Sequence, residues 1–492
     1  MKMLLTCFVI FLSVAQCFAQ TQAQVDYSKN IVQVTVTFQE YDPFLPWQKK
    51  NTGVKSGYGV VVGPYEIITT ENLVRNNTLI ELRKSGSGEK IPATVVLADE
   101  QANLALIKIS DGSDLQGVFP LQLSDNVTRN GDVTMLQFDE TAQIQHGKAQ
   151  VVQLSMKPLP YAPYPTLTFT ILTDLNINGE GSAAIRDGKL SGIVMSYDRS
   201  TRTGSMMPAI TIKHFLADVM QPPYKGFASA GFVWTFLVDP AKRKYFNVNS
   251  HNKGILVLDT MPGSGASETL QSNDVILEWD GYSIDNLGFY EDPDFGRLSF
   301  IYLVMGRRSP GDVIPAKIIR NGKQTEVTVK LTRRIDRDAL VPENITHQRD
   351  EYIVEGGFII RELTGAYLSS YGQDWRRNVD PRIVNIYLTK KNHPDKNDEK
   401  VLILAGVLPN PINIGYQQFR DDVITKINGK PVNNITDVFN ILKKDGSIQR
   451  VTIKSMDVDL ILDQTMLTDA NDELAGLYRI PNLRYQRPLS QQ

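Results

Sequence analysis

Cysteine is nearly absent from this chain of 492 residues, which has two, Cys7 and Cys17. Both lie in a leading segment, residues 1–19, in which Lys2 precedes an apolar run that ends near a small residue, Ala19. This pattern is typical of a cleaved secretory signal, and the apolar run is too short for a comfortable membrane span. Cleavage would remove every cysteine, which excludes disulfides, thiolate metal sites and cysteine nucleophiles. We therefore expect an exported protein, periplasmic or secreted.

Signals for charged partners, cofactors and lipid anchors are weak or missing. The formal net charge is −2 and no Lys- and Arg-rich stripe occurs, so nucleic acid and anionic membranes are not indicated as main partners. The sequence has no metal-ligand spacing, phosphate loop or nucleotide fingerprint, so we expect neither a metal nor a cofactor. A lipoprotein is the weaker alternative, because Gln16 precedes Cys17 where lipoprotein signals have a small residue.

Short β-rich runs dominate residues 28–220. Examples are IVQVTVTF, GYGVVVG, LALIKI and TLTFTILT, and clusters of Gly, Asn and Asp separate them. Many strands with turn signals and few helical patterns predict an all-β barrel or sandwich. One helical segment, ITIKHFLADVM, closes the region before a domain boundary at residues 221–226.

Two later segments resemble each other. The first is GILVLDTMPGSGASETLQSNDVILEWDGYSI and the second is KVLILAGVLPNPINIGYQQFRDDVITKINGKPV. Each predicts a strand, a Pro-containing loop, a short helical piece and the run D-V-I-x-x-x-x-G. Each then continues into a helix-like stretch, RLSFIYLVM or DVFNILKK, and a closing strand. This internal repeat predicts two copies of one module, joined by residues 337–350.

A candidate nucleophile lies in NINGEGSAAI, residues 176–185, where Ser182 ends a small Gly-rich loop. Small neighbours let a substrate carbonyl approach, and adjacent backbone amides can hold an oxyanion. The alternative is a Gly-rich turn between two strands, which most G-x-S sequences are. The loop alone does not say what would activate the serine.

The two modules resemble PDZ domains, on the runs DVILEWDG (274–281) and DVITKING (422–429). A β-rich region followed by two such modules resembles the Deg/HtrA serine proteases over nearly all of the mature chain. The C-terminal half is similar to the plant-type branch, on GFASAGFVW, VEGGFIIRELTGAYLSSYG and the tail around LYRIPN. The resemblance implies a mainly β fold: a trypsin-like double β-barrel in residues 28–220, then PDZ domains in residues 225–336 and, with a C-terminal tail, 351–492.

The catalytic residues of that family carry over only in part. Its histidine run corresponds to IITTENLV, where Asn72 takes the place of the histidine, and its aspartate run to NLALIKI, where Asn103 takes the place of the aspartate. Ser182 is kept, but the glycines after it are Ala183 and Ala184. A neutral carboxamide neither accepts a proton from a serine nor stabilises an imidazolium. The resemblance therefore implies a protease domain with a degenerate triad.

No other residue is expected to supply the missing base. Glu71 adjoins Asn72, but neighbouring side chains point in different directions. Glu180 stands where the family has a glycine that helps form the oxyanion hole, and a carboxylate there repels a developing oxyanion. We expect structural or surface roles for the five histidines, His146, His214, His251, His347 and His393.

The PDZ-like modules suggest peptides as partners. PDZ domains bind extended peptide ends by strand addition, and a loop of amides holds the carboxylate. That loop corresponds to Ser229, Ala230, Gly231 and Phe232 in the first module and to Gly356, Gly357, Phe358 and Ile359 in the second. The alternative, favoured for the second module, is a groove filled by the chain itself or by a neighbouring subunit.

The resemblance also implies a homo-oligomer built on trimers. The aromatic residues Phe38, Phe44 and Trp47 are candidates for that contact, with ordinary packing as the alternative.

Three functional hypotheses follow. The preferred one is an exported pseudoprotease that binds peptides or unfolded proteins as a chaperone, adaptor or regulator. The others are an active serine endopeptidase that uses Ser182 with an unusual base, and a structural oligomer with closed PDZ grooves.

Overall fold

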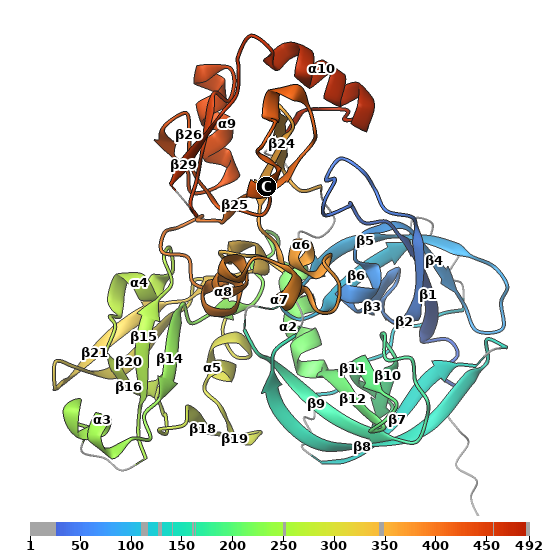
Figure 1. Cartoon of the computed structure of the whole chain (residues 1–492). Helices are drawn as coiled ribbons and strands as arrows, with labels where there is room; N and C mark the ends of the chain where they lie inside the picture. Colours follow the sequence, from blue (N-terminus) through green and yellow to red (C-terminus); the bar gives the residue numbers. More distant parts are fainter. Residues whose placement is uncertain are drawn as a thin grey trace, which may run out of the picture.

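The computed structural model describes residues 26–109, 117–125, 130–139, 141–159, 162, 164–248, 252–343, 349–455 and 457–488. The expected signal segment, residues 1–19, lies outside them. The described chain forms a pair of β-barrels followed by two smaller α+β bodies (Figure 1). We call these bodies the first module, Ala228–Arg333, and the second module, Tyr352–Tyr485.

Each barrel is closed and has six strands. The first has the order β1-β2-β3-β6-β5-β4, with β1 Ile31–Phe38, β2 Gly53–Gly63, β3 Glu66–Thr69, β4 Asn77–Arg83, β5 Ile91–Asp99 and β6 Leu104–Ile109. The second has the order β10-β11-β12-β9-β8-β7, with β7 Gly131–Phe138, β8 Ile144–Lys157, β9 Thr166–Thr173, β10 Ala183–Arg186, β11 Lys189–Asp198 and β12 Thr203–Pro208. The expected double β-barrel is confirmed.

Alternating side chains of one strand enter two different hydrophobic cores. In β1, Val32, Val34 and Val36 are fully buried in the core of the first barrel, whereas Ile31 belongs to the cluster that includes the second barrel. Successive residues of a strand face opposite sides, so one strand serves both cores. The helix predicted before the domain boundary is α2, Ala209–Val219.

The first module is built on a sheet of order β14-β15-β16-β20-β21, with the short β17 paired to β16. Its elements are β13 Ala228–Ser229, β14 Phe232–Phe236, α3 Pro240–Tyr245, β15 Ile255–Thr260, α4 Gly265–Thr269, β16 Val275–Trp279, β17 Tyr282–Ser283, β18 Phe289–Asp292, β19 Gly296–Ser299, α5 Ile301–Met305, β20 Val313–Arg320, β21 Lys323–Lys330 and β22 Thr332–Arg333. The run RLSFIYLVM was expected to be helical throughout, and this is wrong for its first three residues. They pair with β18 in a hairpin, so the helix begins only at Ile301.

The first module packs on the second barrel. All five residues of α5 are buried, and one hydrophobic cluster runs from the second barrel into the module. Phe295, which follows β18, meets Phe169 of β9 edge to face at a centroid distance of 6.4 Å. The module is therefore fixed against the barrels rather than tethered to them.

The second module departs from the first in its sheet. Its strands form two sheets, β25-β24-β23-β30 and β27-β26-β28-β29. The elements are β23 Tyr352–Glu355, β24 Phe358–Glu362, α6 Gly365–Ser369, α7 Trp375–Asn378, α8 Pro381–Lys390, β25 Leu402–Val407, β26 Ile424–Ile427, β27 Lys430–Pro431, α9 Ile435–Asp445, β28 Arg450–Ile453, β29 Val458–Ile461, α10 Leu467–Tyr478 and β30 Arg484–Tyr485, with short 3-10 turns at Pro411–Asn413 and Gln417–Phe419. A further 3-10 turn, Asp336–Asp338, lies between the two modules. β25 forms one isolated bridge, between Ile403 and Val423, with the residue just before β26, whereas the first module pairs β15 with β16 as strands. Opposite faces of β24 enter two cores, because Phe358 and Ile360 pack under α9 while Ile359 faces the helices α6 to α8.

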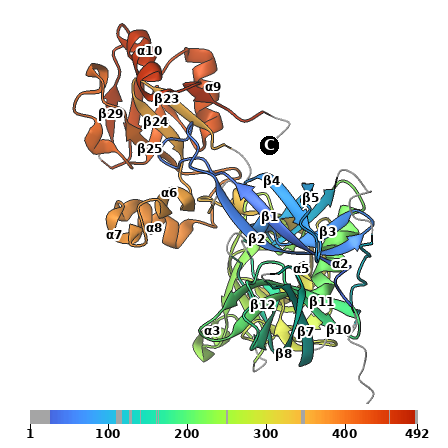
Figure 2. The ribbon, with the colours of Figure 1, turned by 90° about the vertical axis from the view of Figure 1, so that its right-hand side faces the viewer.

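A loop of the first barrel docks on the second module. We call residues 39–52, between β1 and β2, the strap; it reaches the orange and red part of the chain in Figures 1 and 2. Its Trp47 is 5% exposed, lies in a core cluster of the second module and donates through Nε1 to the carbonyl of Tyr478 at 3.2 Å. Phe44 meets Tyr371 edge to face at 5.0 Å. Phe44 and Trp47, named above as candidates for a contact between subunits, thus pack within the chain.

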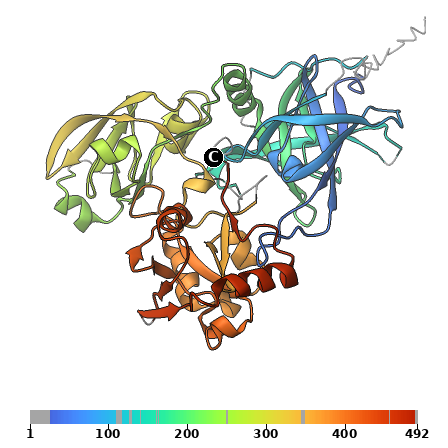
Figure 3. The same cartoon turned by 90° about the horizontal axis from the view of Figure 1, so that it is seen from above.

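The second module lies beside both other parts, as Figure 3 shows from above. The strap joins it to the first barrel, and a hydrogen bond from Arg334 to the carbonyl of Asn392 joins it to the end of the first module. The first module is joined to the first barrel by an ion pair between Arg333 and Asp99. Each pair of parts therefore shares at least one specific contact.

Candidate functional site

Two of the three expected triad positions meet in the first barrel. Asn72 lies in the single helical turn α1, Glu71–Val74, after β3, and Asn103 lies just before β6. The backbone amide of Asn72 donates to Oδ1 of Asn103 at 2.8 Å. Asn103 has a φ of +51°, a left-handed conformation that asparagine tolerates better than most residues. The two asparagines thus support each other across a tight turn.

The serine loop contacts the same place through Glu180. Its Oε1 accepts a hydrogen bond from the side-chain amide of Asn72 at 2.7 Å, and its Oε2 accepts one from the hydroxyl of Thr70 at 2.7 Å. Both oxygens of the carboxylate therefore bind groups of the first barrel. From the sequence, Glu180 was expected to disturb an oxyanion hole. The sequence did not predict that its carboxylate would join the two barrels through hydrogen bonds from Thr70 and Asn72.

The backbone of the serine loop is fixed by close contacts. The carbonyl of Glu180 accepts from the amide of Tyr58 at 2.8 Å. Gly181 has a φ of +79°, and a Cβ atom there would lie 2.0 Å from the carbonyl oxygen of Tyr58. The amide of Glu180, at the position that the resemblance assigns to the oxyanion hole, donates to Oδ1 of Asn178 at 3.0 Å. The loop's own side chain thus occupies a donor that an oxyanion would need.

Ser182 is not presented to solvent. Its exposure is 0%, and its hydroxyl makes no hydrogen bond with any described residue. A general base must lie within hydrogen-bond reach of the proton that it removes. In the described part of the chain, no group holds that position. Glu180, two residues away, directs both of its oxygens to Thr70 and Asn72.

Burial sets the electrostatics of this site. It raises the pKa of the Glu180 carboxyl, against the opposing effect of the hydrogen bonds from Thr70 and Asn72 and of the nearby Lys55. Burial also lowers the pKa of Lys55, whose ammonium donates to the carbonyl of Asn72 at 3.1 Å. The site is therefore a buried polar network centred on one carboxylate. This network joins the two barrels, and the hydroxyl of Ser182 takes no part in it.

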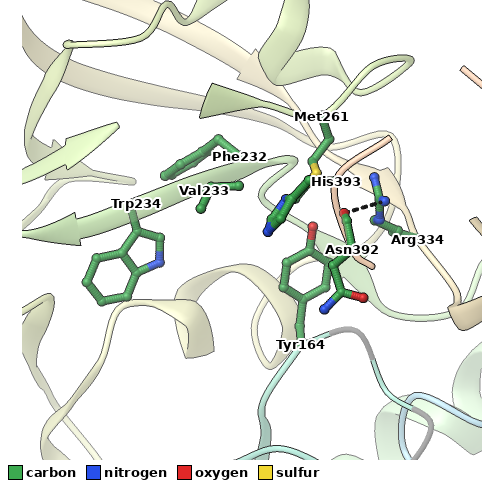
Figure 4. A pocket seen from close by; sticks show the side chains of 8 residues that line it. All are labelled: Tyr164, Phe232, Val233, Trp234, Met261, Arg334, Asn392 and His393. Atoms are coloured by element: carbon green, nitrogen blue, oxygen red, sulfur yellow. Dashed lines mark hydrogen bonds between the residues drawn. The ribbon is translucent and has the colours of Figure 1, made fainter. Parts of the chain in front are cut away.

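The groove strand of the first module has one unpaired edge. Among the described strands, β14 pairs only with β15. A cavity of about 160 Å³ touches three consecutive residues of β14, namely Phe232, Val233 and Trp234 (Figure 4). Successive side chains face opposite sides of a strand, so this cavity lies at its edge. The other residues that line it are Tyr164, Met261, Arg334, Asn392 and His393.

The expected amide loop of the first module is folded on itself. Ser229, Ala230 and Phe232 are buried, and the amide of Gly231 donates to the hydroxyl of Ser229 at 3.1 Å. Ser229 and Gly231 line a second cavity of about 160 Å³, which Arg334 also lines. The loop therefore leads directly into β14, and its role in holding a peptide stays a prediction.

The corresponding strand of the second module has no free edge. β24 lies between β23 and β25, so its backbone is paired on both sides. The amide of Gly356 donates to Oδ1 of Asn471 at 2.8 Å, and the carbonyl of Gly357 accepts from the amide of Leu408 at 2.8 Å. Strand addition at Phe358 and Ile359 would require one of these partners to leave. This geometry favours the alternative of a groove filled by its own chain.

Comparisons with known proteins identify the scaffold. A trypsin-like peptidase domain model matches residues 57–201, and a PDZ domain model matches residues 341–486. Protease Do-like 2, a chloroplastic protein of Arabidopsis thaliana, is 27% identical over 413 residues, which are 82% of this chain and 66% of the relative. The chain belongs to the Deg/HtrA family.

Other members of the Deg/HtrA family match over similar lengths. The mitochondrial protease Do-like 4 of Arabidopsis thaliana is 24% identical over 471 residues, or 94% of this chain and 86% of the relative. A probable periplasmic serine endoprotease, DegP-like, of Marinomonas sp. is 25% identical over 414 residues, which are 81% of this chain and 76% of the relative. The solved structure of the HtrA-type protease AlgWS227A with decapeptide superposes with a TM-score of 0.50 at 18% identity, over 63% of this chain and 96% of that chain. This last likeness supports the fold alone.

Within this Deg/HtrA protein, the described residues bring together only part of the predicted site. Asn72 and Asn103 are hydrogen bonded, and Glu180 links them to the loop of Ser182. That these are the positions of the family's triad stays a prediction. Among the described residues no three His, Cys, Asp or Glu side chains gather to hold a metal ion, and no helix has the length and hydropathy to cross a bilayer.

Proposed function

We propose that this Deg/HtrA protein is an exported pseudoprotease, which binds peptide ends or unfolded polypeptides as a chaperone, adaptor or regulator and does not hydrolyse them. The observation that carries the proposal is the state of the serine. Ser182 is fully buried, its hydroxyl has no hydrogen-bond partner among the described residues, and the nearby Glu180 is engaged by Asn72 and Thr70.

The chemistry of the site supports this proposal. A serine hydroxyl needs a base to become a nucleophile at neutral pH, and the residue at the histidine position of the family is an amide. Removing triad members leaves the weak catalysis that substrate binding and the oxyanion hole provide. In this protein the amide of Glu180 is already bonded to Asn178, so that residual contribution is reduced as well.

Peptide binding is supported by the first module. Its β14 offers an unpaired edge next to a cavity, which is the arrangement that strand addition requires. An HtrA-type relative of known structure carries a decapeptide. The second module lacks such an edge at β24, so we assign peptide binding to the first module. A role of the second module in assembly rests on its resemblance to the plant-type branch.

The second candidate function is an active serine endopeptidase. It is favoured by the retention of Ser182 and by the peptidase domain match, and it requires the serine loop to rearrange before reaction. The third is a structural oligomer whose grooves stay closed. It is favoured by the position of Tyr164, Asn392 and His393, which line the cavity beside β14 from outside the first module.

Cleavage of an unfolded protein separates the first two candidates. The purified chain and its Ser182→Ala variant are incubated with casein, and both are treated with a fluorophosphonate probe. We expect neither cleavage nor labelling above the Ser182→Ala background. Cleavage that is lost in Ser182→Ala would overturn the proposal and direct the search to whichever residue replaces the histidine.

A restoration series tests the reason for inactivity. The double variant Asn72→His, Asn103→Asp returns the side chains of a base and its partner but keeps Glu180. We expect it to stay inactive, because the carboxylate that holds Asn72 would also bind the new imidazole. Adding Glu180→Gly removes that carboxylate, so the triple variant is the first in which casein cleavage is expected. Activity in the double variant alone would show that Glu180 is no obstacle.

Localisation and assembly are part of the proposal. The leading segment is typical of a secretory signal, and the relatives include chloroplastic, mitochondrial and periplasmic proteins. Sequencing of the mature N-terminus from the native host checks cleavage near Ala19. Light scattering on the purified mature chain checks the expected trimer-based assembly, and a monomer at micromolar concentration would contradict it.

A further inference from the structure

A histidine lies at the contact between the two modules. The segment that follows α8 docks on the end of the first module, because the carbonyl of Asn392 accepts a hydrogen bond from Arg334 at 2.9 Å. The same segment touches Gly263, where a Cβ atom would lie 2.8 Å from Oδ1 of Asn397. His393 stands between these two contact points in the sequence, so its surroundings change when the second module leaves the first.

The side chain of His393 is half-buried beside the groove strand. It lines the cavity of about 160 Å³ that touches β14, together with Tyr164, Met261 and Arg334 (Figure 4). Its imidazole has no hydrogen-bond partner among the described residues. A protonated imidazole carries a positive charge and a second N–H donor, and burial penalises both unless an anion or an acceptor meets them.

The charge that shares this cavity with His393 is a cation. Arg334 is 8% exposed, and no ion pair is recorded for it among the described residues. Its guanidinium donates to two main-chain carbonyls, that of Asn392 and, at a longer 3.4 Å, that of Asp338. A second positive charge in the cavity would therefore repel a guanidinium with which no described carboxylate pairs.

The other elements packed around His393 do little to favour its charged form. Burial and the nearby Arg334 lower the pKa of His393 below its ordinary value of 6.5, and Asp259 of β15 opposes them. The second barrel contributes Tyr164, whose pKa burial raises, so its phenol stays neutral. The other residues that line the cavity carry no titratable side chain. The charged neighbours of His393 on its own segment are already paired, Lys391 with Glu343 and Asp395 with Lys390.

Docking of the second module therefore favours the neutral imidazole. Above the ordinary pKa of 6.5, His393 is neutral in the docked and the undocked state, so the equilibrium between them does not depend on its proton. As the pH falls below 6.5, an imidazole exposed to water gains a proton before the docked one does, which shifts the equilibrium toward the undocked state. This shift approaches about tenfold for each pH unit until the docked imidazole is protonated as well.

We propose that His393 is an acid-sensing switch at the contact between the modules: its protonation beside Arg334 releases the second module from the first and uncovers the edge of β14. The strap still holds the second module to the first barrel through Trp47, so the release moves a module without setting it free. The consequence for ligands, that acid makes the groove accessible, rests on the proposed peptide binding of the first module.

Hydrogen exchange of the full-length mature protein tests the switch. It is followed in residues 391–398 and at the unpaired edge of β14, and each rate is divided by the intrinsic rate of an unprotected amide at the same pH. In the wild type we expect protection of both segments to fall by up to about tenfold from about pH 7.5 to about pH 5.5, because protection is inversely proportional to the undocked fraction. Constant protection in the wild type would refute the switch.

Variants of His393 separate the switch from general effects of acid. His393→Gln keeps a neutral polar side chain at every pH, so its protection should stay constant; the same fall as in the wild type would also refute the switch. His393→Lys carries the charge at both pH values and should show low protection throughout. His146→Gln, at a half-buried histidine of β8 in the second barrel, is the matched control and should respond like the wild type. Should His393→Gln not fold, His393→Asn takes its place.

Fluorescence anisotropy connects the switch to binding. The probes are labelled decapeptides that end in Val, Leu, Phe or Ala and whose side chains do not titrate between the two pH values. We expect the best probe to bind the wild type up to about tenfold tighter at the lower pH, because apparent affinity follows the undocked fraction. His393→Gln should bind it equally at both, and His393→Lys tightly at both.

The outcomes keep this inference apart from the proposed function. If exchange responds to His393 but no probe binds the wild type or His393→Lys at either pH, the switch stands and peptide binding by the first module fails. If probes bind and exchange does not respond, peptide binding stands and the switch is wrong. If exchange responds and the wild type binds probes equally at both pH values, the second module does not cover the groove, and that part of the inference is overturned.

Discussion

Trp47→Ala is the change that tests most directly how the second module is held. Trp47 belongs to the strap of the first barrel, yet its indole is 5% exposed inside a core cluster of the second module. Its Nε1 donates to the carbonyl of Tyr478, and its ring lies 5.8 Å from that of Tyr352. The substitution therefore removes a buried aromatic side chain and a hydrogen bond at once.

The expected effect follows from burial. Replacing a buried Trp by Ala typically costs about 3–5 kcal/mol, the sum of the lost transfer free energy and the cavity left behind. The hydrogen bond contributes about 1 kcal/mol of this. Because a loss of 1.4 kcal/mol is tenfold in an equilibrium, the undocked state of the second module should become at least about a hundredfold more populated.

Urea unfolding followed by tryptophan fluorescence and hydrogen exchange measures this loss. We expect the midpoint of the second module to fall and exchange to rise first around Tyr352 and Tyr478. Trp47→Phe keeps most of the apolar contact and should lose about half as much. Val54→Ala, at a position that is 67% exposed just after the strap, is the control and should stay within about 0.5 kcal/mol of the wild type.

An unchanged unfolding free energy in Trp47→Ala would refute the reasoning. It would mean that the strap does not rest on the second module in solution, so Trp47 would be free for another contact. A contact between subunits, the sequence-based alternative for this residue, would then regain support. The same experiment at several protein concentrations separates the two cases, because the difference between Trp47→Ala and wild type depends on concentration only if Trp47 makes a subunit contact.

Three further changes concern the serine loop. Ser182→Ala should raise the unfolding free energy by about 1 kcal/mol, since it removes a buried, unpaired hydroxyl, and a loss in urea unfolding would contradict this. Gly181→Ala should destabilise by at least about 2 kcal/mol, because its φ of +79° is strained for alanine and its Cβ would meet the carbonyl of Tyr58; a wild-type midpoint would be the refuting result. The pKa of Glu180 is raised in the folded protein, so ionisation of its carboxyl group opposes folding. Well below the ordinary pKa of 4.5, the wild type and Glu180→Gln should have the same unfolding free energy. As the pH rises to the folded pKa, the wild type should become less stable than the variant, which urea unfolding across that pH range measures. A difference in unfolding free energy that grows as the pH falls would contradict the raised pKa of Glu180.

The sequence predicted the strands of the barrels because their signal is local, whereas their closure into two barrels was expected only from the resemblance. The alternation in IVQVTVTF is enough to define β1, and the run ITIKHFLADVM is enough to define α2. The repeat D-V-I likewise located β16 and β26. The run RLSFIYLVM misled because its apolar residues fit a helix, whereas pairing with β18 took its start into a hairpin.

Contacts between distant segments carried no such signal. Trp47 and Tyr478 are 431 residues apart, and Arg334 and Asn392 are 58 apart on different modules. Glu180 was singled out from its position beside Ser182, but nothing in the sequence indicated that it would accept from Asn72. Hydrophobic periodicity predicts which face of a strand is buried, but it does not predict which distant segment packs on that face. The residues that close the candidate sites are of this second kind.

The strap and the segment around Asn392 act on one equilibrium, the docking of the second module. Trp47 holds the second module to the first barrel, while the carbonyl of Asn392 holds it to Arg334 at the groove of the first module. If docking of the second module hides the groove, the apparent affinity for a C-terminal peptide equals the intrinsic affinity times the undocked fraction. Trp47→Ala raises that fraction, so it should tighten binding of peptides to the first module, up to the limit at which the groove along β14 is always open. Trp47 is distant from the groove in sequence and lies in another core. Tighter peptide binding in this variant would therefore show that docking of the second module, rather than local contact, controls access to β14. Equal affinity in Trp47→Ala and wild type, with the second module demonstrably loosened, would show instead that Asn392 and His393 set access to β14 locally.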